Sequence, residues 1–158
     1  WLVWVGLVLI MSSSFKFGQF LIKSRLVFYQ TPLSFAFTNI RPVVPGHVLV
    51  SSVRVVSRFQ DLTKEEVSDL FQCVHLIAPK IEQHFNATSL TIAIQDGPEA
   101  GQTVPHVHVH ILPRRTGDFK QNDEVYEALE RIDAEKRTNR TEEEMAEEAD
   151  ILRKLLNL

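Results

Sequence analysis

Three histidines at alternate positions are the residues of this sequence best suited to chemistry. His106, His108 and His110 are separated by single valines and followed by Ile111 and Leu112. Because side chains of a β-strand point alternately to its two faces, the imidazoles would share one face and the aliphatic side chains the other. Imidazole is a nucleophile and proton carrier near neutral pH and also a common metal ligand. The pattern therefore suits catalysis at a phosphorus or acyl centre, a metal site, or a structural row of histidines.

Spacing and composition favour catalysis over a metal site. The outer two histidines would lie about 13 Å apart on an extended strand, too far to converge on one tetrahedral ion without a bend. The strand contains no aspartate or glutamate, and Cys73 is the single cysteine of the chain. Few partners thus remain to complete a ligand shell. We expect no metal bound directly by the protein.

The segment before the histidines predicts a phosphate-binding loop. Residues 96–103 read Asp-Gly-Pro-Glu-Ala-Gly-Gln-Thr and contain two of the six glycines. Glycines let backbone N–H groups turn inward around an anion, and Gln102 and Thr103 would add side-chain donors. The net charge of -3 provides no basic excess for binding nucleic acid or an anionic membrane. We therefore expect a small phosphorylated ligand held by donors in one pocket.

The framework that positions these residues is predicted from short apolar runs. Runs rich in β-branched and aromatic residues predict strands over 15–22, 26–30, 34–39, 47–51, 90–95 and 106–112, the last one ending at Pro113. Their short connections favour an antiparallel meander.

Two capping boxes predict the main helices. Thr63 and Glu66 precede an apolar stripe formed by Val67, Leu70, Phe71, Val74, Ala78, Ile81 and Phe85, and Thr141 and Glu144 begin a C-terminal helix. A short helix is expected over 124–132. The fold class is therefore α+β, an antiparallel meander with one long helix packed on it and a C-terminal helix. We expect one domain over 11–158, with a mobile segment at about 118–140.

The first residues have a different composition. Residues 1–10 carry no charge and precede Met11, and the apolar run is about half the length needed to cross a bilayer. We interpret residues 1–10 as an extraneous or upstream leader, and Met11 as a natural start. The lone Cys73 suits a reducing compartment, so a cytoplasmic location without membrane attachment is expected, with the nucleus left open as a second compartment.

Several strings resemble one known family. Residues 106–112 match the alternating histidine signature of the histidine triad superfamily of nucleotide hydrolases and transferases. Residues 42–47, 95–103 and 122–127 resemble its fragile histidine triad branch. The resemblance, which runs from about Phe15 to the C-terminus, implies a dinucleoside polyphosphate hydrolase, a bis(5'-adenosyl)-triphosphatase that cleaves diadenosine triphosphate to AMP and ADP. It also implies a homodimer and Mg²⁺ or Mn²⁺ carried on the substrate phosphates.

The resemblance further implies roles for the histidines. His108 would attack the α-phosphorus to form an adenylyl-histidine that water then hydrolyses. His110 would bind phosphate and assist the leaving group, while His106 and His47 would support the cluster. For attack, one ring nitrogen of His108 must be unprotonated, so the other should donate to an acceptor such as a backbone carbonyl.

Substrate-binding residues are carried over in the same way. Asn39 matches a ribose-binding position, and a phosphate site would comprise Gln95, Gly101, Gln102, Thr103 and Val104. Phe20 is a departure, because close members of the branch often have histidine after the Gly-Gln pair; an aromatic ring there can still line the base. Tyr126 would be a regulatory or substrate-flanking position.

Two other functions fit the same residues. An adenosine phosphoramidase of the same superfamily would cleave a phosphorus–nitrogen bond, although Gln95 and the segment around Tyr126 favour the hydrolase. A signalling module would use slow turnover to time a nucleotide-bound state. Since both enzymes and the module need the same pocket, the sequence leaves them open.

Overall fold

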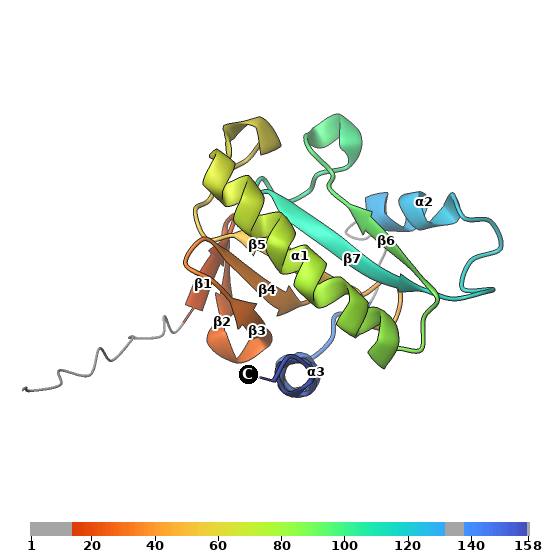
Figure 1. Ribbon diagram of the computed structural model, residues 1–158. Helices are drawn as coiled ribbons and strands as arrows, with labels where there is room; N and C mark the ends of the chain where they lie inside the picture. Colours follow the sequence, from red (N-terminus) through yellow and green to blue (C-terminus); the bar gives the residue numbers. More distant parts are fainter. Residues whose placement is uncertain (1–13, 132–137, 158) are drawn as a thin grey trace, which may run out of the picture.

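The computed structural model describes residues 14–131 and 138–157, and its centre is a five-stranded antiparallel sheet (Figure 1). The strand order is β3-β4-β5-β7-β6. The strands are β3 Val27–Gln30, β4 Ser34–Thr38, β5 Val48–Ser52, β7 His108–Arg114 and β6 Ser89–Ala93. The expected α+β class with an antiparallel sheet is confirmed. The order departs from a simple meander, because β7 lies between β5 and β6.

One face of the sheet is covered by the long helix α1, Lys64–His84 (Figure 1). It begins at the predicted capping box, in which the Thr63 hydroxyl accepts the Glu66 N–H. Buried side chains of α1, including Leu70, Ile77 and Ile81, pack against aliphatic residues of β5 and β7. Phe71, expected on the packed stripe, is 40% exposed, and Cys73 and Ile77 take part in the core instead.

The first predicted strand is a separate hairpin. β1 (Ser14–Phe17) and β2 (Phe20–Lys23) pair antiparallel, and a turn with Gly18 at φ +57° joins them. Glycine adopts this left-handed conformation without the steric cost of a side chain. The hairpin packs on the face opposite α1, where Phe17 contacts Phe37. A run expected to be one strand therefore reverses at its glycine.

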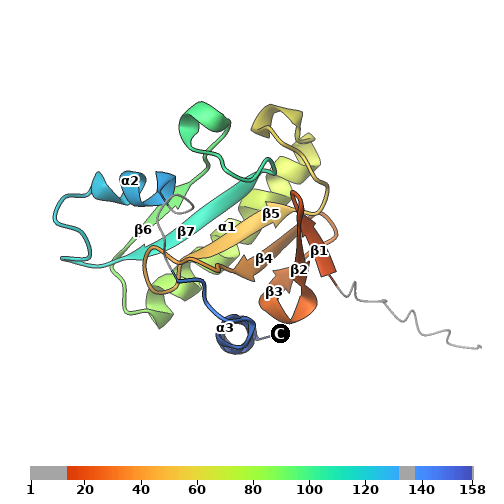
Figure 2. The ribbon, with the colours of Figure 1, turned by 180° about the vertical axis from the view of Figure 1, so that it is seen from behind.

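Two further helices complete the fold, α2 (Glu124–Glu130) and α3 (Glu142–Leu155). Figure 2, which views the molecule from behind, shows α2 beside β6 and β7 and α3 near the β3 end. α3 begins at the second predicted capping box, formed by Thr141 and Glu144. No helix in the described residues is both long enough and apolar enough to cross a membrane. Short 3-10 turns occur at Ser24–Leu26, Phe59–Asp61 and Pro98–Ala100.

Two further sequence expectations bear on the ends of elements. β7 continues through Pro113 instead of ending before it, because pairing with β5 stops at Ile111 and the strand then has one neighbour only. The predicted leader and residues 132–137 of the predicted mobile segment lie outside the described residues. The described part of that segment contains α2 and begins at Asp118, which forms an ion pair with Arg114 of β7; its mobility stays a prediction.

Candidate active site

Four histidines lie together on the sheet face opposite α1. His108 and His110 belong to β7 and stand opposite Ser51 and Leu49 of β5. His106 and His47 were expected to be the first residues of their strands but lie just before β7 and β5. All four are at most 6% exposed. The alternation of the sequence thus separates the histidines from the aliphatic side chains that face α1.

The ring of His108 is held in one tautomer by its own backbone. Its Nδ1 lies 2.7 Å from the carbonyl oxygen of His106. A carbonyl oxygen can only accept, so Nδ1 carries the hydrogen. In a neutral imidazole this places the lone pair on Nε2, as nucleophilic attack requires.

His106 links three parts of the fold. Its Nδ1 accepts the backbone N–H of Gly18 at 3.1 Å, and its Nε2 donates to the carbonyl of Ser52 at 2.8 Å. Burial lowers the pKa of His106, which favours the neutral ring that these bonds require. Both ring nitrogens are therefore engaged, and the residue positions its own carbonyl under His108.

His47 and His110 form a second, directional pair. The N–H of Val43 donates to Nδ1 of His47 at 3.1 Å, so the hydrogen of the neutral ring is on Nε2. That Nε2 lies 2.9 Å from Nδ1 of His110 and donates to it. His110 must then carry its hydrogen on Nε2, and this buried atom has no hydrogen-bond partner among the described residues. The hydrogen bonds run in one direction and end at an unpaired donor.

Burial keeps this second pair neutral. It lowers the pKa of His47 to about 3, with a smaller contribution from His108. Burial also holds the pKa of His110 well below its usual value, with His108 and His47 adding to the effect. The ring of His110 lies 4.8 Å, centroid to centroid, from that of His108. A nucleophilic nitrogen and an N–H donor are thus adjacent, as required to attack one atom of a phosphate and bind another.

The predicted phosphate loop is held by its own side chains. Gln102 accepts the N–H of Gly97 at 2.9 Å and donates to the carbonyl of Ser57 at 2.9 Å. Arg58 pairs with Asp96, which also accepts the N–H of Phe59. The side chain of Gln102, expected to contact phosphate, is instead engaged in holding the loop, whereas the side chain of Thr103 is exposed.

Gly101 places the loop against Gln95. It has φ +83°, and a Cβ atom there would lie 2.6 Å from Nε2 of Gln95 and 3.1 Å from Cγ of Glu130 on α2. Only glycine fits this close approach. The structure therefore brings Gln95 to the loop although β6 ends at Ala93, two residues earlier. Val104 contacts the hairpin, since its Cγ1 would lie 2.7 Å from a Cβ at Gly18.

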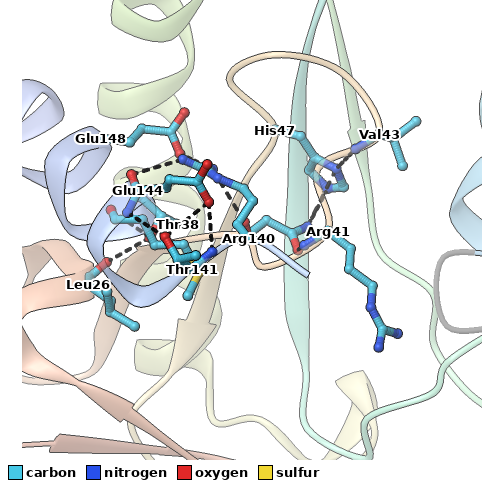
Figure 3. Close-up of polar contacts among 11 residues, drawn as sticks. Leu26, Thr38, Arg41, Val43, His47, Arg140, Thr141, Glu144 and Glu148 are labelled. Carbon is cyan, nitrogen blue, oxygen red and sulfur yellow. Dashed lines mark hydrogen bonds and ion pairs between the residues drawn. The ribbon is translucent and has the colours of Figure 1, made fainter. Parts of the chain in front are cut away.

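Asn39 lies beside the second histidine pair. Its Oδ1 accepts the N–H of Arg41 at 2.9 Å, and its Nδ2 lies 3.3 Å from Nε2 and 3.5 Å from Nδ1 of His47. Figure 3 shows His47 with its bond from Val43 and the polar contacts of the neighbouring strand end. Asn39 is 5% exposed. A ribose at this position would therefore be bound next to the histidines.

Sequence reasoning missed one aromatic residue of the site, Phe17, and two aromatic residues that it proposed lie away from the histidines. The Phe17 ring meets that of His108 edge-on at 5.0 Å and fixes its other side. The signal was the alternation of Phe15 and Phe17 within a strand. Phe20, opposite Phe17 in the hairpin, and Tyr126 on α2 are each 50% exposed and lie outside the histidine cluster, so their roles stay predictions.

The described residues form no evident metal-binding site. Among them, no group of three or more histidine, cysteine, aspartate or glutamate side chains is arranged to hold an ion. The four site histidines bond to backbone groups and to one another instead.

Comparison with known proteins agrees with this geometry. The model of the HIT domain family matches residues 22–117, more than half of the chain. A bifunctional bis(5'-adenosyl)-triphosphatase/adenylylsulfatase of Arabidopsis thaliana is 52% identical over 154 residues, which cover 92% of this chain and 86% of the relative. The bis(5'-adenosyl)-triphosphatase of Dictyostelium discoideum is 49% identical over 139 residues, covering 88% and 91%.

A solved structure supports the same assignment. The diadenosine triphosphate hydrolase of Plasmodium falciparum, crystallised with Cyclomarin A, is similar with a TM-score of 0.77 and 34% identity, over 93% of this chain and 86% of that one. Fold, histidine alternation and sequence identity over most of the chain thus agree. This chain belongs to the HIT domain family, in its fragile histidine triad branch.

Proposed function

We propose that this chain hydrolyses dinucleoside polyphosphates, cleaving diadenosine triphosphate to AMP and ADP. One observation carries the proposal: the ring of His108, with its lone pair on Nε2, lies 4.8 Å, centroid to centroid, from that of His110, whose Nε2–H has no hydrogen-bond partner in the described part of the chain. The relatives named as bis(5'-adenosyl)-triphosphatases are about half identical to the chain and cover most of it.

The proposed reaction has two displacements. Nε2 of His108 attacks the α-phosphorus, the bond to the bridging oxygen breaks, and ADP leaves with that oxygen. The N–H of His110 donates to the departing oxygen and stabilises its charge. Water then attacks the phosphorus of the adenylyl-histidine, and the phosphorus–nitrogen bond breaks with its electron pair returning to Nε2. AMP leaves with the oxygen of the water, one proton from the water passes to solvent, and His108 is neutral again.

The same proposal assigns the substrate contacts. Asn39 would bind the ribose, and Gln95 with the backbone of 101–104 would bind the phosphates. Mg²⁺ or Mn²⁺ would be carried by the substrate phosphates and neutralise part of their charge. Gln102 would act by holding the loop in shape, since both ends of its amide are bonded within the protein.

The homodimer is proposed for the β3 edge of the sheet. Among the described strands β3 has a neighbour on one side only, and the adjacent face of α1 exposes Phe71 and Leu76. Beside them lies a cavity of about 710 Å³, lined by Tyr29, Phe71 and Leu76 together with polar residues that include Asp69 and His75. A second copy would cover this mixed surface and shield the exposed side chains of Phe71 and Leu76. Light scattering should give a dimer, and replacing Phe71 and Leu76 together by Glu should give a monomer; an unchanged dimer would place the interface elsewhere.

A cytoplasmic location, with the nucleus open as a second compartment, is part of the proposal. Cys73 is a buried, unpaired thiol, which suits a reducing compartment. Fluorescence microscopy of the tagged full chain in cells tests this, and a signal confined to the secretory pathway would contradict it.

Product analysis tests the proposed activity. The chain is incubated in parallel with diadenosine triphosphate, an adenosine phosphoramidate and adenosine phosphosulfate, and products are separated by chromatography. We expect the highest kcat/KM for diadenosine triphosphate, with AMP and ADP in equal amounts. Faster phosphoramidate cleavage would favour the phosphoramidase, and nucleotide binding with negligible turnover of all three would favour the signalling module.

A further inference from the structure

The start of helix α3 is bonded to the chain segment that carries Asn39 and His47. The backbone N–H of Arg140 donates to the carbonyl of Ile40 at 3.0 Å, and its guanidinium lies 3.4 Å from the carbonyl of Asn39. The guanidinium also donates to the carboxylate of Glu148 at 2.6 Å and the carbonyl of Glu144 at 3.1 Å (Figure 3). One side chain therefore joins the first turns of α3 to the end of β4.

Neighbouring contacts reinforce this junction. The hydroxyl of Thr38 donates to the carbonyl of Met145 at 3.2 Å, and Arg41 donates to the side chain of Asn139 at 2.6 Å. Residues on both sides of Asn39 are thus tied to the C-terminal segment. Asn39 itself turns its amide toward His47 and is nearly fully buried.

The geometry of Arg140 is specific to arginine. Its ion pair with Glu148 is partly shielded, since the two side chains are only 21% and 16% exposed. The planar guanidinium bonds a carboxylate and two carbonyl oxygens at once, which a lysine ammonium on a flexible stem cannot reproduce with the same geometry. Its bonds therefore hold the peptide of Asn39 at a set distance from α3.

We infer that Arg140 is a positioning residue for the nucleoside end of the site, acting through Asn39. It fixes the backbone of Asn39 and so orients the amide that would bind ribose. Nε2 of His47 already donates to His110, so it cannot accept from Nδ2 of Asn39, which lies 3.3 Å away. The histidine pair is held instead by the N–H of Val43, which does not involve α3. Arg140 therefore controls nucleotide affinity more than the chemical step. This inference rests on the proposed function, in which Asn39 contacts substrate.

The same helix offers a matched control. Arg153 of α3 donates to the carbonyls of Val27 and Arg25 at 3.1 and 2.6 Å, and it ties α3 to the protein as Arg140 does. Its carbonyl partners lie at the start of β3 and in the 3-10 turn before it, and none belongs to the histidine cluster. Loss of Arg153 should weaken the packing of α3 without moving Asn39.

The experiment compares Arg140→Gln, Arg140→Lys, Arg153→Gln, Asn39→Ala and the double variant Asn39→Ala with Arg140→Gln, all in the full chain. Thermal unfolding measures packing, steady-state kinetics give KM and kcat, and calorimetry gives the Kd of AMP. For Arg140→Gln we expect KM and the Kd of AMP to rise about three- to tenfold, the loss typical of one displaced hydrogen bond, with kcat within about twofold. Arg140→Lys should keep more than half of this loss of AMP affinity, measured on a logarithmic scale.

The controls separate positioning from general stability. Arg153→Gln should lower Tm comparably and leave KM and the Kd of AMP unchanged. The double variant should bind AMP no more weakly than Asn39→Ala alone, because Arg140 acts through that residue. Equal increases in KM for Arg140→Gln and Arg153→Gln would overturn the inference. Additive losses of AMP binding free energy in Arg140→Gln and Asn39→Ala would overturn it as well.

A failure of the proposed function gives a different result. If the unmodified chain hydrolyses none of the tested substrates, the AMP affinities still decide the role of Arg140. If Asn39→Ala leaves the Kd of AMP unchanged, the ribose contact assigned to Asn39 is wrong and the inference fails with it. If Asn39→Ala weakens AMP binding and Arg140→Gln does not, the inference alone fails.

Discussion

The two histidine pairs of this site differ in how their hydrogen bonds end. In the pair of His106 and His108, backbone groups take up both nitrogens of His106 and Nδ1 of His108. In the pair of His47 and His110, hydrogen bonds run from Val43 through both rings and end at a buried N–H that no described residue accepts from. The first pair thus sets a lone pair in place, and the second presents a donor.

This difference shows how four similar side chains acquire separate roles. A buried neutral imidazole is a nucleophile or a donor according to which nitrogen the protein occupies. Here a carbonyl occupies Nδ1 of His108, and another imidazole occupies Nδ1 of His110. Displacing the carbonyl from His108 should therefore impair the nucleophile and leave the donor intact, and removing His47 should impair the donor and leave the nucleophile intact.

The largest effect should follow loss of the nucleophile. His108→Asn removes the attacking nitrogen, so we expect kcat for diadenosine triphosphate to fall at least about 10⁴-fold. The Kd of AMP measured by calorimetry should stay within about fivefold, because the second pair and the loop remain. Turnover within tenfold of the unmodified protein would exclude His108 as the nucleophile.

Loss of the donor pair should have a smaller effect that depends on the leaving group. His110→Asn should reduce kcat for diadenosine triphosphate about 10²- to 10⁴-fold, the usual contribution of a positioned acid. His47→Asn should reduce kcat by part of that factor, because it acts through His110. The loss of kcat in the double variant should therefore be smaller than the product of the two single losses.

The control for this prediction is a substrate whose leaving group needs no proton, such as the nitrophenyl ester of AMP. Its cleavage should be much less sensitive to His110→Asn than cleavage of diadenosine triphosphate. Equal losses with both substrates would contradict a donor role for His110.

A change outside the histidines should break the first pair. Gly18 donates to His106, and an added Cβ would meet Cγ1 of Val104 at 2.7 Å. Gly18→Ala should therefore displace His106 and its carbonyl and lower kcat about tenfold, with a Tm several degrees lower. Gly117→Ala is the matched control, since it has the same sign of φ but no atom within 4 Å of the added Cβ.

Gly117→Ala should lower Tm through backbone strain and leave kcat unchanged. If Gly18→Ala and Gly117→Ala affect kcat equally, the link from the hairpin turn to His108 is not functional.

The smallest effect concerns the pH dependence of stability. The folded protein keeps His47 neutral down to about pH 3, whereas the unfolded chain binds this proton near pH 6.5. Because the unfolded state then binds more protons, stability is highest above pH 6.5 and falls as pH decreases below it. Each such histidine should contribute up to about 1.4 kcal/mol per pH unit to the free energy of unfolding.

Urea unfolding between pH 7.5 and about 5.5 measures this slope, a window that lies above the ordinary pKa values of 4.5 and 3.8 at which lowered-pKa carboxyls such as Glu66 and Asp118 begin to contribute. His47→Asn should flatten it, since one titrating group is removed. A slope unchanged in that variant would contradict a neutral, buried His47.

Much of this site was predictable because it depends on local periodicity. The alternation of residues 106–112 predicted which side chains share a face, and two capping boxes predicted the starts of α1 and α3. Long-range neighbours were not predictable in the same way. Nothing local indicates that Gly18 bonds to His106, or that β7 lies between β5 and β6.

The missed roles have the same physical origin. Phe17 reads as an ordinary core residue until the hairpin folds it against His108. Gln102 reads as a phosphate donor until the loop closes and its amide bonds to Gly97 and Ser57. A sequence therefore shows which side chains can donate hydrogen bonds, but tertiary contacts decide which partner each of them binds.

Trapping of the covalent intermediate tests the central claim most directly. The protein is mixed with diadenosine triphosphate, quenched in alkali after milliseconds, digested and analysed by mass spectrometry. We predict one adenylyl group on His108 that appears before AMP and decays as AMP forms. Product formation with no adduct, or an adduct on His106, His110 or His47 instead, would contradict the assignment of the two histidine pairs.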